Sequence, residues 1–122
     1  AEAASPVQGR DKRGPTAVCL SELCYDHSKF MDGVCVNLKI HPTAVSNEEG
    51  LGKLRMMSQT YFNMGGAEIQ YNIVGSDTMR EAQADPQKYR DLVVRIAGYS
   101  AYFVELGLDN QNDLISRTEN ML

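Results

Sequence analysis

The sequence has no tryptophan, only two histidines and only three cysteines among its 122 residues. An odd number of cysteines argues against a disulfide scaffold, and the spacing of Cys19, Cys24 and Cys35 matches no zinc-binding pattern. His27 and His41 are too far apart in sequence for the His-x₃₋₅-His spacing of a zinc site. We therefore expect no metal site, and we expect all three cysteines to be ordinary buried or half-buried thiols.

Positive charge and long apolar runs are also scarce. The chain carries 12 Lys and Arg against 16 Asp and Glu, for a net charge of −4, and the basic cluster at Arg10, Lys12 and Arg13 is too short to indicate nucleic-acid binding. No apolar run approaches the length of a membrane span, and the first residues lack the order of charge, apolar core and cleavage site of a signal peptide. The sequence thus predicts a cytoplasmic protein that binds neither nucleic acid nor membranes.

What is present indicates a folded chain. A content of 43% hydrophobic and 23% charged residues is typical of one globular domain or of a piece of a larger one. Residues 1–15 are rich in Ala, Pro, Gly and charge, which predicts a loop lying against something else. This loop is either a mobile terminus or the mark of a cut through a larger protein.

Hydrophobic periodicity predicts an α/β chain in the order β-α-β-α-β-α, with three strands at most. The predicted strands are a half-buried one over 34–40, a half-buried one over 67–74 and a buried one over 92–96. The predicted helices open at Pro15, at a Ser46/Glu49 capping box, at Ser76 or Asp77, at Asp85-Pro86 and at Asp109, the last one reaching Leu122.

The strand patterns also predict which side chains face solvent. Asn37 and Lys39 alternate with apolar residues, so they are expected on a solvated face, although lining a substrate cavity is the alternative. In the second strand Glu68, Gln70 and Asn72 are expected to point outward. Met56, Met57 and Met64 are expected in the core of the helix that follows residue 46.

A glycine interrupts the most apolar stretch of the chain, DLVVRIAGYSAYFVEL, at Gly98. The simplest interpretation is a bend or a close backbone approach after a strand. The alternative is that the chemistry of the site requires a residue without a side chain. Apolar neighbours would then cover that residue, namely Val93, Val94, Ile96, Tyr102, Phe103 and Val104.

The stretch RIAGYSA around this glycine resembles the signature of glycyl radical enzymes, Arg-Val-Ser/Ala-Gly-Tyr/Phe-Ser/Ala, with Ile96 in place of valine. The segments SPVQGRDKRGPTA, VNLKIHP, EIQYNIV and QNDLISRTE are similar to other parts of the carboxyl-terminal region of these enzymes. The resemblance covers essentially the whole chain. It is closer to the branch of dehydratases, decarboxylases and carbon–sulfur or carbon–nitrogen lyases than to the formate-lyase branch.

The resemblance implies that Gly98 carries a stable backbone radical. Without a Cβ, a Cα radical can flatten and conjugate with both neighbouring peptide groups. An activating enzyme that uses S-adenosylmethionine and an iron–sulfur cluster would generate the radical, so that this chain itself binds no cofactor. Tyr99 would pack over the radical or lie in the core, and Arg95 would steady the loop, dock the activating enzyme or form a plain surface ion pair; Ile96, Ala97 and Ser100 complete the loop.

The resemblance further implies a fold. Residues 1–45 would be the end of a ten-stranded α/β barrel, and residues 46–122 would be the glycine radical domain with its terminal helix. In the family the radical passes to a cysteine in a Cys-x-Glu loop, and none of the three cysteines here precedes such a glutamate. We therefore expect that loop in another part of the enzyme, which could be a homodimer.

Three interpretations stay open at this point. The chain is a segment or subunit of a full enzyme, an autonomous spare part that restores an oxygen-damaged enzyme, or an inert module that only binds its partners. The resemblance to the branch of dehydratases, decarboxylases and lyases favours the first interpretation. The substrate is not encoded in these residues.

Overall fold

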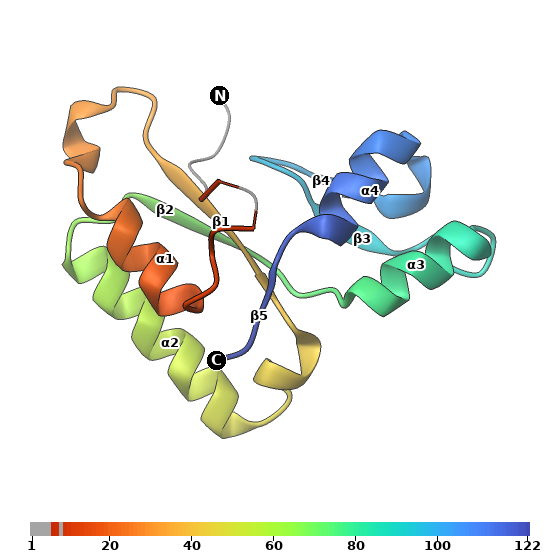
Figure 1. Cartoon of the computed structure of the whole chain (residues 1–122), viewed down its shortest axis with the longest axis horizontal. Coiled ribbons are helices and arrows are strands. Elements are labelled where there is room, and N and C mark those ends of the chain that lie inside the picture. Colours follow the sequence, from red (N-terminus) through yellow and green to blue (C-terminus); the bar gives the residue numbers. More distant parts are fainter. Residues whose placement is uncertain (1–5, 8) are drawn as a thin grey trace.

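The computed structural model describes residues 6–7 and 9–122, so the expected loop over residues 1–15 lies partly outside the described residues. The described residues form two groups of elements (Figure 1). The first group contains α1 (Pro15–Glu22), β1 (Cys35–Ile40), α2 (Glu48–Asn63), β2 (Glu68–Asn72) and β5 (Glu119–Asn120). The second group contains α3 (Ser76–Ala84), β3 (Val93–Arg95), β4 (Ser100–Tyr102) and α4 (Leu108–Ser116).

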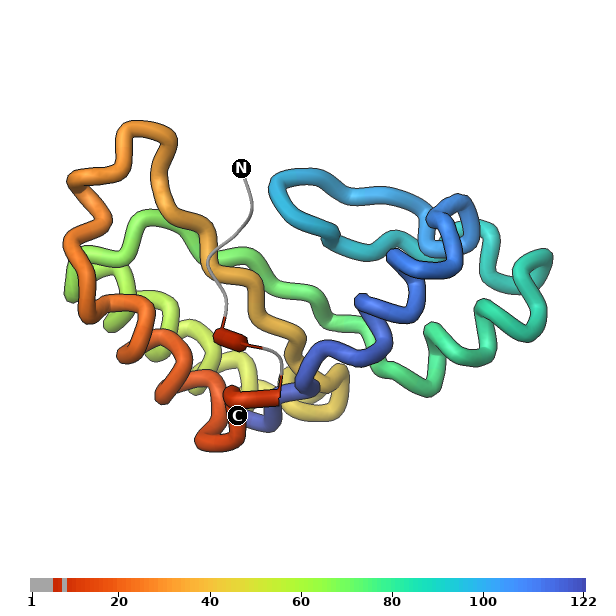
Figure 2. The backbone as a smooth tube through the Cα atoms, turned by 45° about the horizontal axis from the view of Figure 1, so that its top comes forward, coloured from red at the N-terminus to blue at the C-terminus, as the bar shows by residue number. Residues whose placement is uncertain are grey.

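The first group is built on a parallel sheet in the order β2-β1-β5. Helices α1 and α2 lie side by side on one face of this sheet (Figures 1 and 2). The predicted alternation in β1 is confirmed on that face, where Val36, Leu38 and Ile40 pack against Val18, Cys19 and Tyr61. The crossover helix α2 covers the strands that it connects, as parallel pairing requires.

Helix α2 begins differently from the prediction. Asn47, not Ser46, is the N-cap, and its Oδ1 accepts a hydrogen bond from the Gly50 N–H (2.8 Å). Ser46 instead donates its hydroxyl proton to the Thr43 carbonyl in the 3₁₀ helix η2 (Pro42–Val45). A Cβ on Gly50 would lie 1.8 Å from the Ala44 carbonyl oxygen, so this close approach explains the glycine in the first turn.

The methionine prediction for α2 is wrong in part. Met56 is 69% exposed and Met64 is exposed as well, whereas Met57 packs against the core. The helix ends at Asn63, with Met64 as its C-cap. Only one of these three methionines therefore packs against the core.

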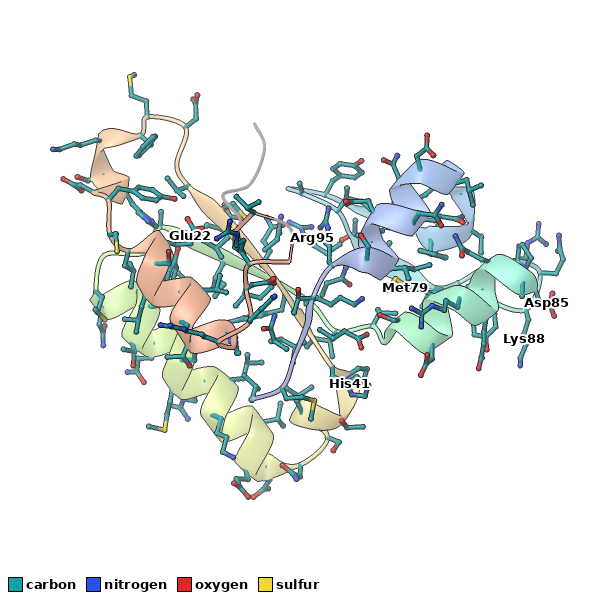
Figure 3. The ribbon with its side chains drawn as sticks, in the orientation of Figure 1. Glu22, His41, Met79, Asp85, Lys88 and Arg95 are labelled. Carbon is teal, nitrogen blue, oxygen red and sulfur yellow. The ribbon has the colours of Figure 1, made fainter. Side chains whose placement is uncertain are left out.

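The second group has its own core, formed by Met79, Ala82, Val94, Phe103 and Leu114. Met79, on α3, lies between this helix and α4 (Figure 3). Strands β3 and β4 pair antiparallel, with Val94 opposite Ala101, and the resulting hairpin extends back toward β1 and β2 (Figures 1 and 2).

Several predicted elements of this half are wrong. Residues 85–92 form successive turns instead of a helix, with the Tyr89 N–H bonded to the Pro86 carbonyl and the Leu92 N–H to the Tyr89 carbonyl. The N-caps of α3 and α4 are Gly75 and Gly107, not Ser76, Asp77 or Asp109.

The chain end also departs from the predicted helix. Helix α4 stops at Ser116, and the residues after it form β5 beside β1. The Asn120 carbonyl accepts a hydrogen bond from the His41 N–H (3.0 Å), and the Asn120 side chain donates to the Lys39 carbonyl (3.1 Å). The backbone groups after α4, which a longer helix would have bonded internally, thus form hydrogen bonds with the open edge of β1. With β4 and β5, which were not predicted, the described residues contain five strands, against the three expected.

Candidate functional site

Gly98 lies in the loop that joins β3 to β4. The Ile96 N–H donates to the Tyr99 carbonyl (2.9 Å), which closes the loop. Gly98 has a φ of 76°, a conformation that side-chain-bearing residues rarely adopt. Apart from Gly98 and its two chain neighbours, no described residue has a heavy atom within 4 Å of the position that a Cβ would take here. The loop therefore selects glycine by its backbone conformation, not by crowding.

Two carboxamides of β2 hold this loop against the sheet. Gln70 Oε1 accepts hydrogen bonds from the Gly98 N–H (3.2 Å) and from Arg95 Nε (3.0 Å). Asn72 Nδ2 donates to the Arg95 carbonyl (3.0 Å). Both side chains were expected to point into solvent, but Gln70 is buried and Asn72 half-buried. The polar face of β2 is thus the face that meets the Gly98 loop.

Two arginines bind the loop from either side. Arg95, at the end of β3, also donates to the Ser100 hydroxyl (3.2 Å), and it lies where the hairpin meets the sheet (Figure 3). Arg117, which follows α4, donates to the Ile96 carbonyl (3.3 Å) and forms an ion pair with Asp113 (2.9 Å). The Arg95 guanidinium thus takes part in the hydrogen bonding that steadies the loop.

The apolar cover predicted for Gly98 is incomplete. Val94 and Phe103 are buried, and Ile96 and Val104 are half-buried, but all four belong to the core of the second group. Val93 is 50% exposed, Tyr102 46% and Tyr99 55%, so Tyr99 is not a core aromatic residue. Gly98 itself is exposed among the described residues. Apolar neighbours in sequence do not become a shield, because alternate hairpin residues point to opposite faces.

A polar cleft of about 480 Å³ lies beside the loop. Arg95 and Ala97 line it from the hairpin, and Arg117 lines it from the segment after α4. The sheet contributes polar side chains from both long strands, Asn37, Lys39, Gln70 and Asn72. The cavity-lining alternative for Asn37 and Lys39 therefore fits the structure better than a solvated face.

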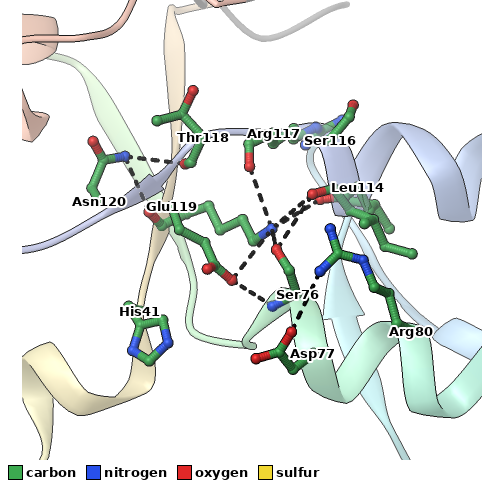
Figure 4. A network of polar contacts seen from close by, with 12 residues as sticks. His41, Ser76, Asp77, Arg80, Leu114, Ser116, Arg117, Thr118, Glu119 and Asn120 are labelled. Atoms are coloured by element: carbon green, nitrogen blue, oxygen red, sulfur yellow. Dashed lines mark hydrogen bonds and ion pairs between the residues drawn. The ribbon is translucent and has the colours of Figure 1, made fainter.

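Lys39 is buried at the bottom of this region and connects the two groups of elements. Its ammonium donates to the Ser76 hydroxyl (2.7 Å) and to the carbonyls of Leu114 (3.3 Å), Ile115 (3.2 Å) and Arg117 (3.3 Å). It also pairs with Glu119 (3.5 Å), which accepts a hydrogen bond from the Ser76 N–H. Figure 4 shows Ser76, Glu119, Leu114 and Arg117 around this point. The lysine thus satisfies carbonyls at the end of α4 that lack helical partners.

Glu119 makes the stability of this network depend on pH. Burial by itself raises its pKa, but hydrogen bonds from Ser76 and the charge of Lys39 outweigh burial and hold the pKa below its ordinary value. Such a carboxyl contributes stability above its unfolded pKa and loses it as the pH falls through the folded pKa. We expect the free energy of unfolding to fall between about pH 6 and about pH 3, and to fall less in Glu119→Gln.

Urea unfolding of the wild type and of Glu119→Gln, at both ends of this pH range, measures how much stability each loses on acidification. Asp26 and Glu49, whose pKa values are also lowered, are present in both chains, so their contributions cancel. An equal loss of stability in both chains would contradict the role given to Glu119.

The three cysteines are free thiols, as expected, but they are not all covered. Cys19 is buried, Cys35 half-buried and Cys24 exposed, so the prediction of burial is wrong for Cys24. Burial raises the pKa of Cys19 and of Cys35 to about 11 each, so both are protonated thiols near neutral pH.

The remaining residues of the predicted loop lie beside Gly98. Ile96 is half-buried, Ala97 lines the cleft and Ser100 begins β4. Sequence reasoning missed Gln70, Asn72, Arg117 and Glu119 as loop or network residues. A regular polar face on β2 was visible in the sequence, but nothing in it indicated that another part of the chain covers that face. Among the described residues, no helix is long and apolar enough to cross a membrane.

The chain is similar in sequence to known proteins. A family model described as "Glycine radical" matches residues 1–104. "Probable dehydratase YbiW" from Escherichia coli (strain K12) is 46% identical over 123 residues, which cover 100% of this chain and 15% of that protein. Indoleacetate decarboxylase from Tractidigestivibacter scatoligenes is 47% identical over 116 residues, which cover 95% of this chain and 13% of that protein.

A solved structure gives the same result. The glycerol-bound form of the B12-independent glycerol dehydratase from Clostridium butyricum superposes with a TM-score of 0.95 at 41% identity, covering 100% of this chain and 16% of that one. The chain thus spans less than a fifth of the length of the proteins it matches. The predicted family and branch are confirmed: the chain belongs to the glycyl radical enzyme family and corresponds to the radical-bearing segment of its dehydratases and decarboxylases.

Proposed function

We propose that Gly98 stores the unpaired electron of a glycyl radical lyase, dehydratase or decarboxylase that acts on a small organic substrate. The observation that supports this most is the position of Gly98 at a hairpin tip, with φ at 76° and its N–H bound to Gln70. It is the glycine of the RIAGYSA stretch within the segment that matches the family model.

The chemistry needs a residue without a side chain. When a hydrogen atom leaves Cα with one electron of the C–H bond, the other electron stays on Cα and the carbon flattens. The peptide nitrogen on one side and the carbonyl on the other then share that electron. We assign the abstraction to an activating enzyme that uses S-adenosylmethionine and an iron–sulfur cluster, and that enzyme would take up the hydrogen atom. The loop that presents Gly98 to the activating enzyme consists of Arg95, Ile96, Ala97, Tyr99 and Ser100.

The rest of the enzyme would complete the site. Gly98 is exposed within the described residues, and a stored radical must be kept from water, thiols and oxygen. We therefore propose that the cover and the Cys-x-Glu loop belong to other parts of the enzyme, which this chain, at 13% to 16% of its relatives, does not include. Residues 1–45 would end a ten-stranded α/β barrel, and residues 46–122 would be the glycine radical domain. The assembly of the enzyme as a homodimer and its location in the cytoplasm stay predictions.

The match to dehydratases and a decarboxylase supports a segment of a full enzyme over an autonomous spare part or an inert module. A direct test exposes the chain to the activating enzyme of such an enzyme under anaerobic conditions and records its EPR spectrum. We expect a doublet, because the unpaired electron couples to the one remaining α-hydrogen. In a chain made with α-deuterated glycine, the doublet should collapse to a single line. A chain that gives no radical signal would overturn the proposal.

A further inference from the structure

We propose that Gln70 is the positioning residue of the radical loop, which fixes the peptide plane on the amino side of Gly98. The inference rests on the proposed function of Gly98, since only a stored radical gives this plane its importance. Gln70 lies 28 residues before Gly98, so its role arises only from the fold.

The orientation of the Gln70 carboxamide has one consistent solution. Gln70 is 8% exposed, and its Nε2 donates to Glu68 Oε1 (2.6 Å). A carboxylate accepts hydrogen bonds only, so Glu68 requires the amino group on its side. The oxygen must then face the other way, where the N–H of Gly98 and the Nε of Arg95 are both donors. Each group meets its complement only in this orientation.

Glu68, Gln70 and the loop therefore form a directional chain of hydrogen bonds. The Arg95 guanidinium, bound to the same oxygen as Gly98, also contacts the Ser100 hydroxyl across the hairpin. Asn72 restrains the Arg95 carbonyl from the same strand. One buried side chain of β2 thus sets the positions of both the residue that opens the loop and the glycine at its tip.

This contact bears on the radical as well as on the fold. The lone pair of the Gly98 nitrogen donates into the half-filled p orbital on Cα. The overlap of these two orbitals depends on the plane of the Ala97–Gly98 peptide. An acceptor on the N–H restrains that plane and pulls the proton away, which enriches the nitrogen in electron density. We expect the loss of Gln70 to change the coupling between the electron and this nitrogen, a change that a purely structural contact would not produce.

The first measurement is made on the resting full chain, labelled with ¹⁵N-glycine. Amide hydrogen exchange at Gly98 reports how often its N–H leaves the acceptor. In Gln70→Leu we expect exchange to be faster by roughly three- to tenfold, the equilibrium weight of one such hydrogen bond. Gln70→Asn keeps a polar amide but is one methylene too short, so it provides the same test in a second background.

The second measurement is made on the activated chain. Pulsed EPR of the ¹⁵N-glycine-labelled radical should show an altered nitrogen coupling in Gln70→Leu and Gln70→Asn. The double variant Glu68→Gln/Gln70→Glu exchanges the carboxylate and the carboxamide, so that position 70 still accepts from Gly98 and Arg95 while position 68 donates. We expect this exchange of partners to restore both the slow amide exchange and the wild-type coupling.

The matched control is Gln83→Leu. Gln83 is a half-buried carboxamide that also belongs to a network, donating to Gln111 (3.2 Å) and Asn112 (3.0 Å), but these partners lie on α4 and not in the loop. Neither measurement should change there. Unaltered amide exchange and unaltered nitrogen coupling in both Gln70 variants would overturn the role of Gln70. A wild-type chain that forms no radical would instead overturn the proposed function, and the amide exchange would still test the contact.

Discussion

Replacing Gly98 by alanine is expected to abolish the radical doublet completely. An alanine radical at this position would carry a methyl group on the flattened carbon, and the resting residue would have to keep a φ of 76° that alanine disfavours. Because no heavy atom of the described residues lies within 4 Å of the position that the alanine Cβ would take, the substitution should not create a clash. We expect a loss of about 1 to 2 kcal/mol in the free energy of unfolding and an otherwise intact fold.

Gly33→Ala is the matched control for this change. Gly33 has a φ of 75°, and no heavy atom among the described residues lies within 4 Å of its Cβ position either. The two substitutions should therefore cost about the same stability, about 1 to 2 kcal/mol each in urea unfolding. Only Gly98→Ala should lose the EPR doublet, whereas Gly33→Ala should keep it. A doublet that survives in Gly98→Ala would place the radical elsewhere.

Oxygen gives the same variant a second readout. A Cα radical that combines with molecular oxygen leads to cleavage of the chain at that residue, so an activated wild-type chain exposed to air should break at Gly98. Mass spectrometry should find the break in the wild type and in Gly33→Ala, and find Gly98→Ala uncut. Cleavage of Gly98→Ala at this position would contradict the assignment.

Replacing Lys39 by methionine is expected to be the most destabilising of these substitutions. Methionine keeps most of the apolar stem but removes the ammonium, leaving the Glu119 carboxylate and the carbonyls of Leu114, Ile115 and Arg117 without this donor. The Lys39 side chain is only 2% exposed, so water cannot replace it readily. We expect a loss of about 3 to 5 kcal/mol, the usual result of removing one partner from a buried ion pair.

Lys53→Met is the matched control. Lys53 pairs with Glu49 at 2.8 Å on the surface of α2, and its side chain is 53% exposed. The same substitution there should change the free energy of unfolding by less than about 0.5 kcal/mol. Urea unfolding at neutral pH compares the two variants. Equal effects at both positions would show that the buried network contributes no more than a surface pair.

The Lys39 variant should also loosen the radical loop. Lys39 holds the Arg117 carbonyl, and the Arg117 guanidinium holds the Ile96 carbonyl two residues before Gly98. The same buried charge therefore stabilises the contact between the two groups of elements and one anchor of the loop. Its ammonium is costly to bury, which lowers the pKa of Lys39 despite the opposing charge of Glu119.

The family and the alternation of β1 could be predicted from the sequence because each is a local property. The RIAGYSA stretch is contiguous, and the apolar side chains of β1 recur every second residue whatever lies next to them. Helix ends were less predictable: Asn47 caps α2 one residue after the predicted Ser46, since both residues are good caps and the contact with η2 decides between them.

The sequence by itself determined the family, and its contiguous RIAGYSA stretch singled out Gly98 as the residue that we propose holds the backbone radical. Only the tertiary structure decided which side chains hold the loop around Gly98. A period of two tells which side of β2 carries Gln70 and Asn72, but not that a hairpin 23 to 28 residues further on lies against that side. Likewise, Lys39 looked solvated until α4 and β5 brought partners from 75 or more residues away. Burial of a polar side chain depends on distant partners that satisfy it, and those partners are set by packing.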